Sequence, residues 1–496
     1  MSERRPYIDY VLVAVAQSLP LQVLLGSFIL LAAYIWHTSR TITTAPTEFS
    51  KLTQKPWSKE EIREAYRKVQ TSPTDVRPYL FSQHNRRYIV VGGSGLVGGW
   101  IVQHLLMRGE NPAAIRIIDL SEPTRKEVAE QNIVFLKADV SDAAAVSKAV
   151  NASWPKNVSA LPLTVFHTVA YISPCDRKSD FLPIYVRVNI EGTRNVLKAA
   201  REAGASCFIA TSSSSVGMKP PAFFPWPWQR WPKNLCQFLP NAERENLDDP
   251  LHEFGSCYSW SKAQAEQLVR SANDPRAKFL TGCIRPGHSI YGHGVQNTSS
   301  ITYDYLRRGG SPSWIPTCVV NFVNAQNVSI GHLAYENAVL KNSDLGGRAY
   351  CVTDPSPPTR YGELYKVLTT LAHPLTPIAF PYVSHLPMLI MAYMIETYII
   401  IRHRYFPALP PVTGDIAYIQ PAMFNMCTLH VVYTDTKAKE EIGYRGPIET
   451  LEGFAAAVAD WNKKWETLSK EKIQAGRADE VELQEGAAMP KGPNIH

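Results

Sequence analysis

Short apolar runs alternate with helix-like stretches through the middle of the chain. The apolar runs have the length of buried strands, and they are Tyr88–Val91, Ile115–Ile118, Val134–Leu136, Val165–Phe166, Phe208–Ala210 and Phe279–Ile284. The helix-like stretches between them include Trp100–Met107, Ala143–Val150, Asn189–Ala203 and Ala263–Ser271. This alternation is typical of α/β proteins, in which helices cover both faces of a parallel sheet. We therefore predict a doubly wound parallel sheet.

A long apolar run stands near the amino end. From Tyr10 to Ser39 the chain contains no Asp, Glu, Lys or Arg, whereas a bilayer core needs only about 20 apolar residues in a helix. A cleaved signal peptide has a shorter apolar core, of about 7–15 residues, so the run favours an anchor that spans a membrane once. Basic residues lie on both sides, at Arg4 and Arg5 before the run and at Arg40 after it. Charge alone therefore leaves the orientation open.

Composition excludes several classes of protein. The 496 residues are 45% hydrophobic and 19% charged, which is globular usage and excludes wholesale disorder. The formal net charge of +7 is mild and scattered, so we expect no nucleic-acid partner. The eight cysteines form no CxxC pair and no cluster with metal-ligand spacing. They predict reduced core thiols and no metal site, with a disulfide framework as the alternative.

A glycine-rich turn follows the first strand. Val91 runs into Gly92-Gly93-Ser94-Gly95-Leu96-Val97-Gly98, and a helix-like stretch comes next. Such a turn lets backbone N–H groups approach a pyrophosphate and brings the helix close to the strand. Its position between a strand and a helix predicts a dinucleotide-binding turn made of all seven residues.

Two carboxylates follow at the ends of later strands. Asp119 ends the second strand about 20 residues after the last glycine, where a carboxylate accepts hydrogen bonds from ribose hydroxyls and repels a 2′-phosphate. This favours NAD, although Arg125 and Lys126 nearby could offset the repulsion and leave NADP open. Asp139 ends the third strand, where it could contact adenine or stand at the start of a helix.

A Tyr-Lys pair opens a later helix. Tyr258 and Lys262 are four residues apart and therefore share one helix face. A nearby ammonium and an oxidised nicotinamide would both lower the pKa of the phenol, which would make it a base for an alcohol. Upstream, the strand that ends at Thr211 is followed by a run of serines, at the edge where parallel sheets bind ligands.

Together these segments resemble the extended short-chain dehydrogenase/reductase superfamily and, within it, the 3β-hydroxysteroid dehydrogenase family. The matching motifs are VVGGSGLVGG at 90–99, VNIEGTRNVLKAA at 188–200, TSSSSV at 211–216, YSWSK at 258–262, IRPGHSIYG at 284–292, NFVNAQNVSIGHL at 321–333 and GGRAYCVTDPSP at 346–357. The resemblance covers about residues 87–465.

The resemblance implies roles for single residues. Ser213, Tyr258 and Lys262 take the catalytic roles, with Ser212 and Ser214 as alternatives to Ser213. Tyr258 and Lys262 also contact the cofactor, and Pro286 and His288 line its nicotinamide. Asn189 matches a family asparagine with a structural or a catalytic role.

Two segments depart from the family pattern. The first is an insert rich in Trp, Phe and Pro, running from Lys219 to Lys233 within 218–240. It suits a bilayer interface, or an aromatic lid on the substrate pocket. The second is the apolar stretch Leu386–Ile401, whose only charge is Glu396. It is short for a span and predicts a membrane-surface helix or a core helix.

These features divide the chain. Ser58 and Glu61 form a capping box that predicts a helix over Glu60–Gln70. We predict a tail at 1–9, an anchor at 10–39, a linker with this helix at 40–86, an NAD(P)-binding Rossmann domain at 87–353, a substrate-binding and membrane-proximal region at 354–466 and a disordered tail at 467–496.

The expected function is that of a membrane-anchored, NAD(P)-dependent oxidoreductase. We expect it to oxidise a secondary, 3β-type hydroxyl of a sterol, triterpenoid or meroterpenoid-like lipid, with coupled decarboxylation or isomerisation left open. We expect the protein to lie in the endoplasmic reticulum membrane with its catalytic domain in the cytosol. Whether it forms a homodimer is left open. The alternatives are a sugar-nucleotide epimerase, a dihydroflavonol-type reductase or a non-catalytic NAD-sensing scaffold on the same fold.

Overall fold

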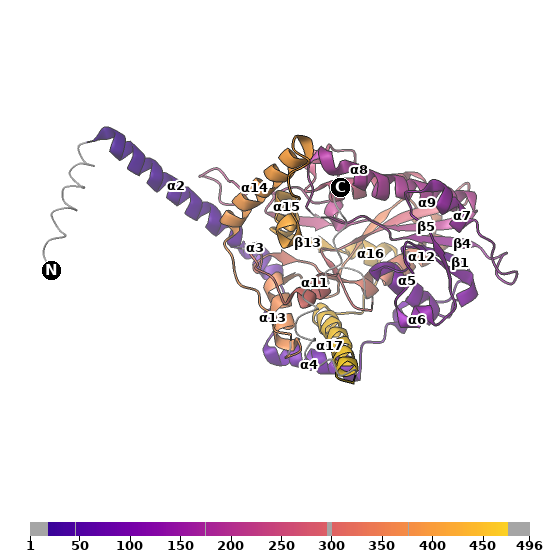
Figure 1. The fold of residues 1–496 in the computed structure, drawn as a ribbon. Helices are drawn as coiled ribbons and strands as arrows, with labels where there is room; N and C mark the ends of the chain where they lie inside the picture. Colours follow the sequence, from indigo (N-terminus) through magenta and orange to yellow (C-terminus); the bar gives the residue numbers. More distant parts are fainter. Residues whose placement is uncertain (1–17, 45, 174, 295–299, 375, 475–496) are drawn as a thin grey trace.

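A seven-stranded parallel sheet forms the centre of the molecule (Figure 1). The computed structural model describes residues 18–44, 46–173, 175–294, 300–374 and 376–474. The strand order is β11-β7-β5-β4-β1-β2-β3. Their bounds are β1 (Arg87–Val91), β2 (Ile115–Asp119), β3 (Val134–Lys137), β4 (Leu163–His167), β5 (Ala205–Thr211), β7 (Leu280–Pro286) and β11 (Ala349–Val352). The doubly wound sheet is confirmed, and its order reverses between β1 and β4, where such sheets bind ligands.

Helices cover both faces because alternate strand residues point in opposite directions. Val90 packs in one buried cluster with α5 (Leu96–Met107) and α12 (Ala325–Lys341). Ile89 and Val91 pack in the opposite cluster, with α7 (Ala143–Val150), α9 (Gly192–Glu202) and α10 (Cys257–Ser271). The strands are therefore apolar on both faces, as the unbroken runs in the sequence predict.

A second core lies beside the sheet. It packs α4 (Lys59–Thr71), α11 (Ile301–Arg308), α13 (Tyr361–Leu371) and α17 (Thr450–Gln474) together. The capping box of α4 is confirmed, since the Ser58 hydroxyl accepts from the Glu61 N–H and Glu61 accepts from the Ser58 N–H. Much of the segment at 40–86 is thus part of a core, and the region at 354–466 shares that core with earlier helices.

The remaining elements connect these layers. The short helices are α3 (Thr47–Leu52), α6 (Lys126–Ala129), α8 (Leu182–Tyr185), α15 (Pro421–Cys427) and α16 (Thr436–Glu441). The short strands are β6 (Cys236–Pro240), β8 (Ile290–Tyr291), β9 (Val319–Val320), β10 (Val323–Asn324), β12 (Thr359–Arg360) and β13 (His430–Thr434), and β6 pairs with β13 at the end of the insert. All eight cysteines are free, as expected.

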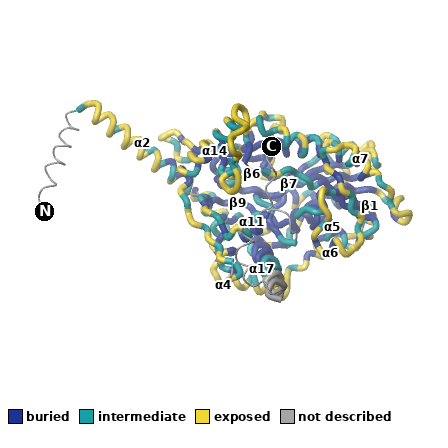
Figure 2. The backbone as a smooth tube through the Cα atoms, in the orientation of Figure 1, coloured by how far each residue is buried: buried dark blue, intermediate teal, exposed yellow. Residues whose placement is uncertain are grey.

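Two helices stand at one end of the molecule. α2 (Leu19–Thr43) projects from the body and is exposed except at its inner end, and α14 (His385–Arg404) lies beside that end (Figures 1 and 2). Among the described residues, the helical region that begins at Leu19 is long and apolar enough to cross a membrane. One side of α14 is buried and the other exposed, so α14 is not a helix enclosed by the core.

Parts of both chain termini lie outside the described residues. The predicted tail at 1–9, the first part of the anchor and residues 475–496 lie there. α17 continues to Gln474, past the predicted start of the disordered tail at 467. Its last turns are rich in Lys, Glu and Gln, which extend a helix readily.

Candidate active site

The glycine turn between β1 and α5 has the shape of a phosphate cradle. Gly92 has φ +89°, which only glycine adopts readily, and Gly95 precedes the first turn of α5 without any side-chain cap. A Cβ atom on Gly98 would lie 2.1 Å from the Gly92 oxygen, and one on Gly93 would meet Ile117 at 2.9 Å. The helix thus approaches the strand closely and leaves its amino end open, which fits a dinucleotide pyrophosphate.

Residues Ser94, Leu96 and Val97 complete this turn, and Asp119 stands beside it. Ser94, Leu96 and Val97 are half-buried. The Asp119 carboxylate accepts from the Ser94 N–H at 3.0 Å and from the Leu120 N–H at 2.7 Å. Burial raises the pKa of Asp119 above its ordinary value, although these N–H groups oppose the shift. Asp119, which the sequence predicts to bind the cofactor ribose, therefore lies next to the phosphate cradle.

The basic residues after Asp119 do not stand beside its carboxylate. The Arg125 guanidinium lies over the Trp100 ring at 3.9 Å and donates to the His293 carbonyl at 3.2 Å. Lys126 is exposed and pairs with Glu130 at 3.7 Å. Arg125 is thus held away from the Asp119 carboxylate, and the preference for NAD over NADP stays a prediction.

Asp139 closes a turn at the end of the third strand. Its carboxylate accepts from the Ser141 N–H at 2.8 Å, and the residue is exposed. The residue that caps α7 is Asp142, which accepts from the N–H groups of Ala144 and Ala145. Asp139 is thus not the helix cap. Because it is exposed, its carboxylate is free to contact the adenine of the cofactor, and this contact stays a prediction.

Tyr258 and Ser213 come together at the carboxyl end of β5. Tyr258 stands in the first turn of α10, behind the Ser256 cap, and is half-buried. Burial raises the pKa of Tyr258 to about 12, against a smaller lowering by a hydrogen bond with Ser213. The Ser213 hydroxyl also lies 2.8 Å from that of Ser215.

The neighbouring serines have other partners. The Ser212 hydroxyl donates to Glu266 at 2.7 Å. Ser214 is buried and hydrogen-bonds Tyr433. Of the three serines that the sequence leaves open, Ser213 is therefore the one that meets the phenol.

Lys262 lies one turn after Tyr258 but points to β5. Its ammonium donates to the Thr211 carbonyl at 2.6 Å, and the side chain is buried. Burial lowers the pKa of Lys262 to about 8. In the protein alone, the pKa of Tyr258 is therefore raised and not lowered as expected, because the effect of burial outweighs that of the single hydrogen bond with Ser213.

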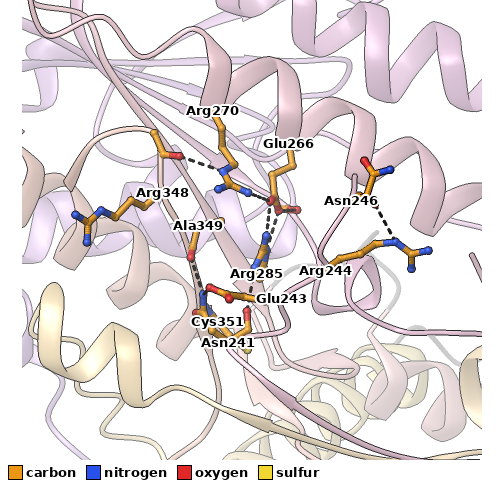
Figure 3. Close-up of polar contacts among 12 residues, drawn as sticks. Asn241, Glu243, Arg244, Asn246, Glu266, Arg270, Arg285, Arg348, Ala349 and Cys351 are labelled. Atoms are coloured by element: carbon orange, nitrogen blue, oxygen red, sulfur yellow. Dashed lines mark hydrogen bonds and ion pairs between the residues drawn. The ribbon is translucent and has the colours of Figure 1, made fainter. Parts of the chain in front are cut away.

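A buried ion pair below this site was missed by the sequence reasoning. Glu266, one turn beyond Lys262, accepts from Arg285 of β7 at 2.9 Å and from Arg270 at 3.2 Å (Figure 3). Although burial alone would raise it, Arg285 holds the pKa of Glu266 below its usual range. Arg285 also donates to the Asn241 carbonyl at 3.0 Å. The sequence signal that could have revealed the pair is Glu266 itself, a carboxylate four residues after Lys262 and therefore on the same helix face.

Asn189 holds the catalytic helix from the other side. Its amide oxygen accepts from the Tyr171 N–H at 2.7 Å, and its amide N–H donates to the Ser261 hydroxyl at 2.9 Å. The side chain is 1% exposed. Of the structural and catalytic roles that the resemblance leaves open, these contacts support the structural one.

Pro286 and His288 follow β7. Pro286 ends the strand and pairs with Val352 of β11. His288 is buried, its Nε2 lies 2.7 Å from the Tyr361 hydroxyl, and burial lowers its pKa to about 4. His288 is therefore a neutral link to α13, and its contact with a nicotinamide stays a prediction. Among the described residues, no group of three or more His, Cys, Asp or Glu side chains could hold a metal ion.

Solved structures with this fold include sugar-nucleotide enzymes. The structure of gox2253 superposes with a TM-score of 0.52 at 20% identity, covering 76% of this chain and 98% of that one. UDP-glucose-4-epimerase from Stenotrophomonas maltophila gives 0.52 at 15% identity, covering 77% and 99%. At such low identity these likenesses support the fold alone.

Sequence relatives are more specific. The chain is 28% identical to mouse "sterol-4-alpha-carboxylate 3-dehydrogenase, decarboxylating", covering 74% of this chain and 88% of the relative. It is 25% identical to "3beta-hydroxysteroid-dehydrogenase/decarboxylase isoform 2" of Arabidopsis thaliana, covering 76% and 62%. The sequence model of the 3-beta hydroxysteroid dehydrogenase/isomerase family matches residues 89–380, which include the glycine turn, Asp119, Ser213, Tyr258 and Lys262. The chain therefore belongs to the 3-beta hydroxysteroid dehydrogenase/isomerase family and is a nicotinamide-dependent dehydrogenase.

Proposed function

We propose that the chain oxidises a secondary, 3β-type hydroxyl of a sterol, triterpenoid or meroterpenoid-like lipid, with NAD as the acceptor. The observation that carries the proposal is the Ser213–Tyr258 pair at the carboxyl end of β5, with the Lys262 ammonium held one helical turn away. The names of the mouse and Arabidopsis relatives support a sterol-type substrate.

The residues divide the chemistry among them. Ser213 donates a hydrogen bond to the substrate oxygen and orients it, and Tyr258 takes the hydroxyl proton as a general base. A bound NAD supplies a hydride acceptor for the carbinol carbon and a positive charge that favours the phenolate. Lys262, charged below its pKa of about 8, is held on the Thr211 carbonyl one helical turn after Tyr258, and its ammonium would hold the ribose of the bound cofactor. Asp119 binds the hydroxyls of the other ribose.

Coupled loss of carbon dioxide is the finer part of the proposal. If a carboxylate is β to the new ketone, the C–C bond breaks and its electron pair enters the carbonyl as an enolate. The leaving carbon departs as carbon dioxide, so no oxidant is needed beyond the first step. The name of the mouse relative supports this order, because it joins a 3-dehydrogenase with decarboxylation.

We also place the enzyme at the endoplasmic reticulum membrane, anchored by α2 with the catalytic domain in the cytosol. The exposed apolar length of α2 supports the anchor. The eight free thiols suit a reducing compartment.

A substrate panel tests the proposal. The detergent-solubilised full chain is incubated with NAD and either 3β-hydroxysterols, with and without a 4-carboxylate, or UDP-sugars, and separately with NADPH and dihydroflavonols. NADH formation, sugar epimers and reduced flavonoids are each measured. We expect NADH absorbance to rise only with the sterol-type alcohols. Turnover of UDP-sugars alone would support the epimerase alternative, and NAD binding without any turnover would support the scaffold alternative.

The variant Tyr258→Phe tests the mechanism in the same assay. Losing the general base lowers kcat by about 10³-fold or more, while NAD binding stays within about twofold because the glycine turn is untouched. Retained turnover would reject Tyr258 as the base.

A further inference from the structure

The outward side of α14 is apolar and carries no charge as far as Ile401, before Arg402 and Arg404 in its last turn. Within residues 385–401, Glu396 is the only Asp, Glu, Lys or Arg, and its side chain is buried. The exposed side chains include Ile390, Met391 and Met394, and Met394 is 68% exposed. A contiguous apolar surface of this kind is unfavourable in water and marks an interaction site.

The tip of the aromatic insert is exposed in the same way. Phe224, Trp226 and Trp228 are all exposed, and Trp228 is 77% exposed. The rings of Trp226 and Trp228 stack on each other with centroids 5.1 Å apart, so neither is covered by the core. Arg230 and Lys233 follow them and are exposed. Tryptophan beside basic residues is the composition of a bilayer interface.

Both surfaces are joined to the foot of α2. Ile42 of α2, Phe223 of the insert, Leu389 of α14 and Phe424 of α15 pack in one buried cluster. His37 of α2 also hydrogen-bonds the Gln229 carbonyl of the insert at 3.1 Å. Figure 1 shows α14 running along the body from the foot of α2. The insert and α14 are therefore held beside the segment that we take as the membrane anchor.

The same elements contact the start of the catalytic helix. Glu396 of α14 accepts both hydrogen bonds of Arg177, each at 2.7 Å. The Asp176 carbonyl, next in the chain, accepts from the Cys257 N–H at 2.7 Å, and Cys257 precedes Tyr258. On the α15 side, Asn425 donates to the Gly255 carbonyl at 3.1 Å. The apolar surface is thus linked by hydrogen bonds to the first turn of α10 through Glu396, Arg177 and the Asp176 backbone.

We propose that the insert tip at 224–228 and the outer side of α14 form a second membrane contact, embedded in the interface of the bilayer that α2 crosses. A phospholipid surface is the occupant because the two surfaces continue from the anchor and basic residues border them. The inference rests on the proposed function in taking α2 as the anchor. It adds that the catalytic domain itself sits in the lipid, so a lipid-dissolved alcohol enters beside α14 and meets Tyr258 directly.

Fluorophore depth in a bilayer tests this contact. The full chain is reconstituted into nanodiscs of phosphatidylcholine and phosphatidylserine, with a single environment-sensitive label on Trp228→Cys, Met394→Cys, Leu30→Cys of α2 or Lys198→Cys of α9. The half-buried Cys236 and Cys427 are changed to Ser in every variant. Spin-labelled lipids replace part of the bilayer and quench only labels that contact the acyl region.

The expected pattern is quenching by about twofold or more at 228, 394 and 30, with no quenching at 198. Quenching at 30 alone would overturn the second contact and leave the anchor intact. Absence of quenching at 30 as well would remove the anchor itself, which is a failure of the proposed function. Disulfide cross-linking between copies of the unlabelled Met394→Cys variant under an added thiol oxidant, together with no lipid quenching at 394, would overturn the proposal in favour of a second copy on this face.

The double variant Met394→Glu and Trp228→Glu gives a second readout. Two charges at the interface should lower kcat/KM by about tenfold for a sterol presented in vesicles, and leave kcat/KM unchanged for the same sterol presented in detergent micelles. Since both assays use one protein preparation, a folding defect would lower both values. An equal loss in the two assays, or no loss in either, would contradict the route through the lipid.

Discussion

The glycine turn after β1 and the aromatic insert after β5 both leave the same edge of the sheet, yet they are held in opposite ways. The glycine turn is fixed by its own backbone: the Gly95 N–H donates to the Gly92 carbonyl at 3.0 Å, and Gly92 donates to Ile118 at 2.8 Å. The insert closes its own stem, since the Ala222 N–H donates to the Lys233 carbonyl at 2.9 Å, but remote side chains hold it against the domain, because Phe223 packs on His385 and Phe424. The glycine turn is positioned by the strands and the helix directly beside it, whereas the insert takes its position against α14 and α15 only when the whole domain has folded.

The difference bears on function. A local turn can keep one geometry for a phosphate in any fold that supplies a strand and a helix. An insert held by distant elements can place apolar residues outside the core, beside α2 and α14, and still remain attached to the catalytic helix. The return of the insert ends at Asn241, whose carbonyl accepts from the Arg285 that also pairs with Glu266.

The largest effect is expected from Glu266→Ala, which removes the attachment between this return and the catalytic helix. The substitution leaves Arg285 buried and without its counter-charge, which costs about 3–5 kcal/mol. The free energy of unfolding is measured by urea denaturation of the detergent-solubilised full chain, followed by intrinsic fluorescence.

The matched control is Glu191→Ala, which removes an exposed Glu–Arg pair on α9's amino side. Surface pairs are worth at most about 1 kcal/mol. Equal losses in the two variants would mean that the buried pair does not hold the insert's return, and the contrast between the two loops would lose its energetic basis.

The next effect concerns the glycine turn alone. In Gly98→Val the new Cβ would lie 2.1 Å from the Gly92 oxygen, so the helix must move away from the strand. We expect the Kd for NAD to rise by about 100-fold, measured by calorimetric titration. Gly95→Ala is the graded comparison, because its Cβ would lie 3.2 Å from the same oxygen. A larger loss at Gly95 than at Gly98 would contradict the geometry of the cradle.

Lys262 is buried at the end of β5, the strand that leads to the insert, and its removal should stabilise the fold. Since burial lowers its pKa from 10.5 to about 8, the unfolded chain binds its proton more tightly and Lys262 destabilises the folded state at neutral pH. Lys262→Met should therefore raise the free energy of unfolding at pH 7. We expect a net gain of about 2 kcal/mol, which already subtracts about 1 kcal/mol for the lost hydrogen bond to Thr211. Turnover should be lost.

The pH dependence supplies the check on that prediction. The wild-type penalty is full below pH 8 and disappears as the pH rises from about 8 to 10.5, where the unfolded chain also loses the proton. The difference in stability between wild type and Lys262→Met should shrink over this interval. A difference that stays constant would show that the gain comes from packing and not from the buried charge.

Sequence reasoning reached the sheet, the glycine turn, Asp119 and the Tyr258–Lys262 helix because each is encoded within a few neighbouring residues. It chose Ser213 from the resemblance and kept Ser212 and Ser214 as alternatives, since adjacent serines differ only in which distant partner they meet: Glu266 for Ser212 and Tyr433 for Ser214. The pKa of Tyr258 was also out of reach. It depends on burial and on the direction of Lys262, and both are set by the packed fold.

The discontinuous second core was missed for a similar reason. α4 and α17 come from opposite ends of the chain, and Lys68 pairs with Glu452 at 2.8 Å. Their amphipathic patterns predict helices and say nothing of which helix each one meets. The apolar character of α14 was visible in the sequence, but the side that faces inward is known only from the fold, which buries Leu389 and pairs Glu396 with Arg177.

The smallest effect is expected from Asp119→Asn, which tests how far the glycine turn selects its cofactor. The Asp119 carboxylate would repel a 2′-phosphate, and no cation of the loop stands beside it, since Arg125 is engaged by Trp100 and His293. Removing the charge should shift the ratio of kcat/KM for NADP to that for NAD by about tenfold towards NADP. Glu122→Gln, an exposed carboxylate on the same loop, is the matched control and should leave the ratio within about twofold. Equal shifts in both variants would assign the preference to the overall charge of the loop, and the local geometry of the turn would then position the pyrophosphate without choosing between the two dinucleotides.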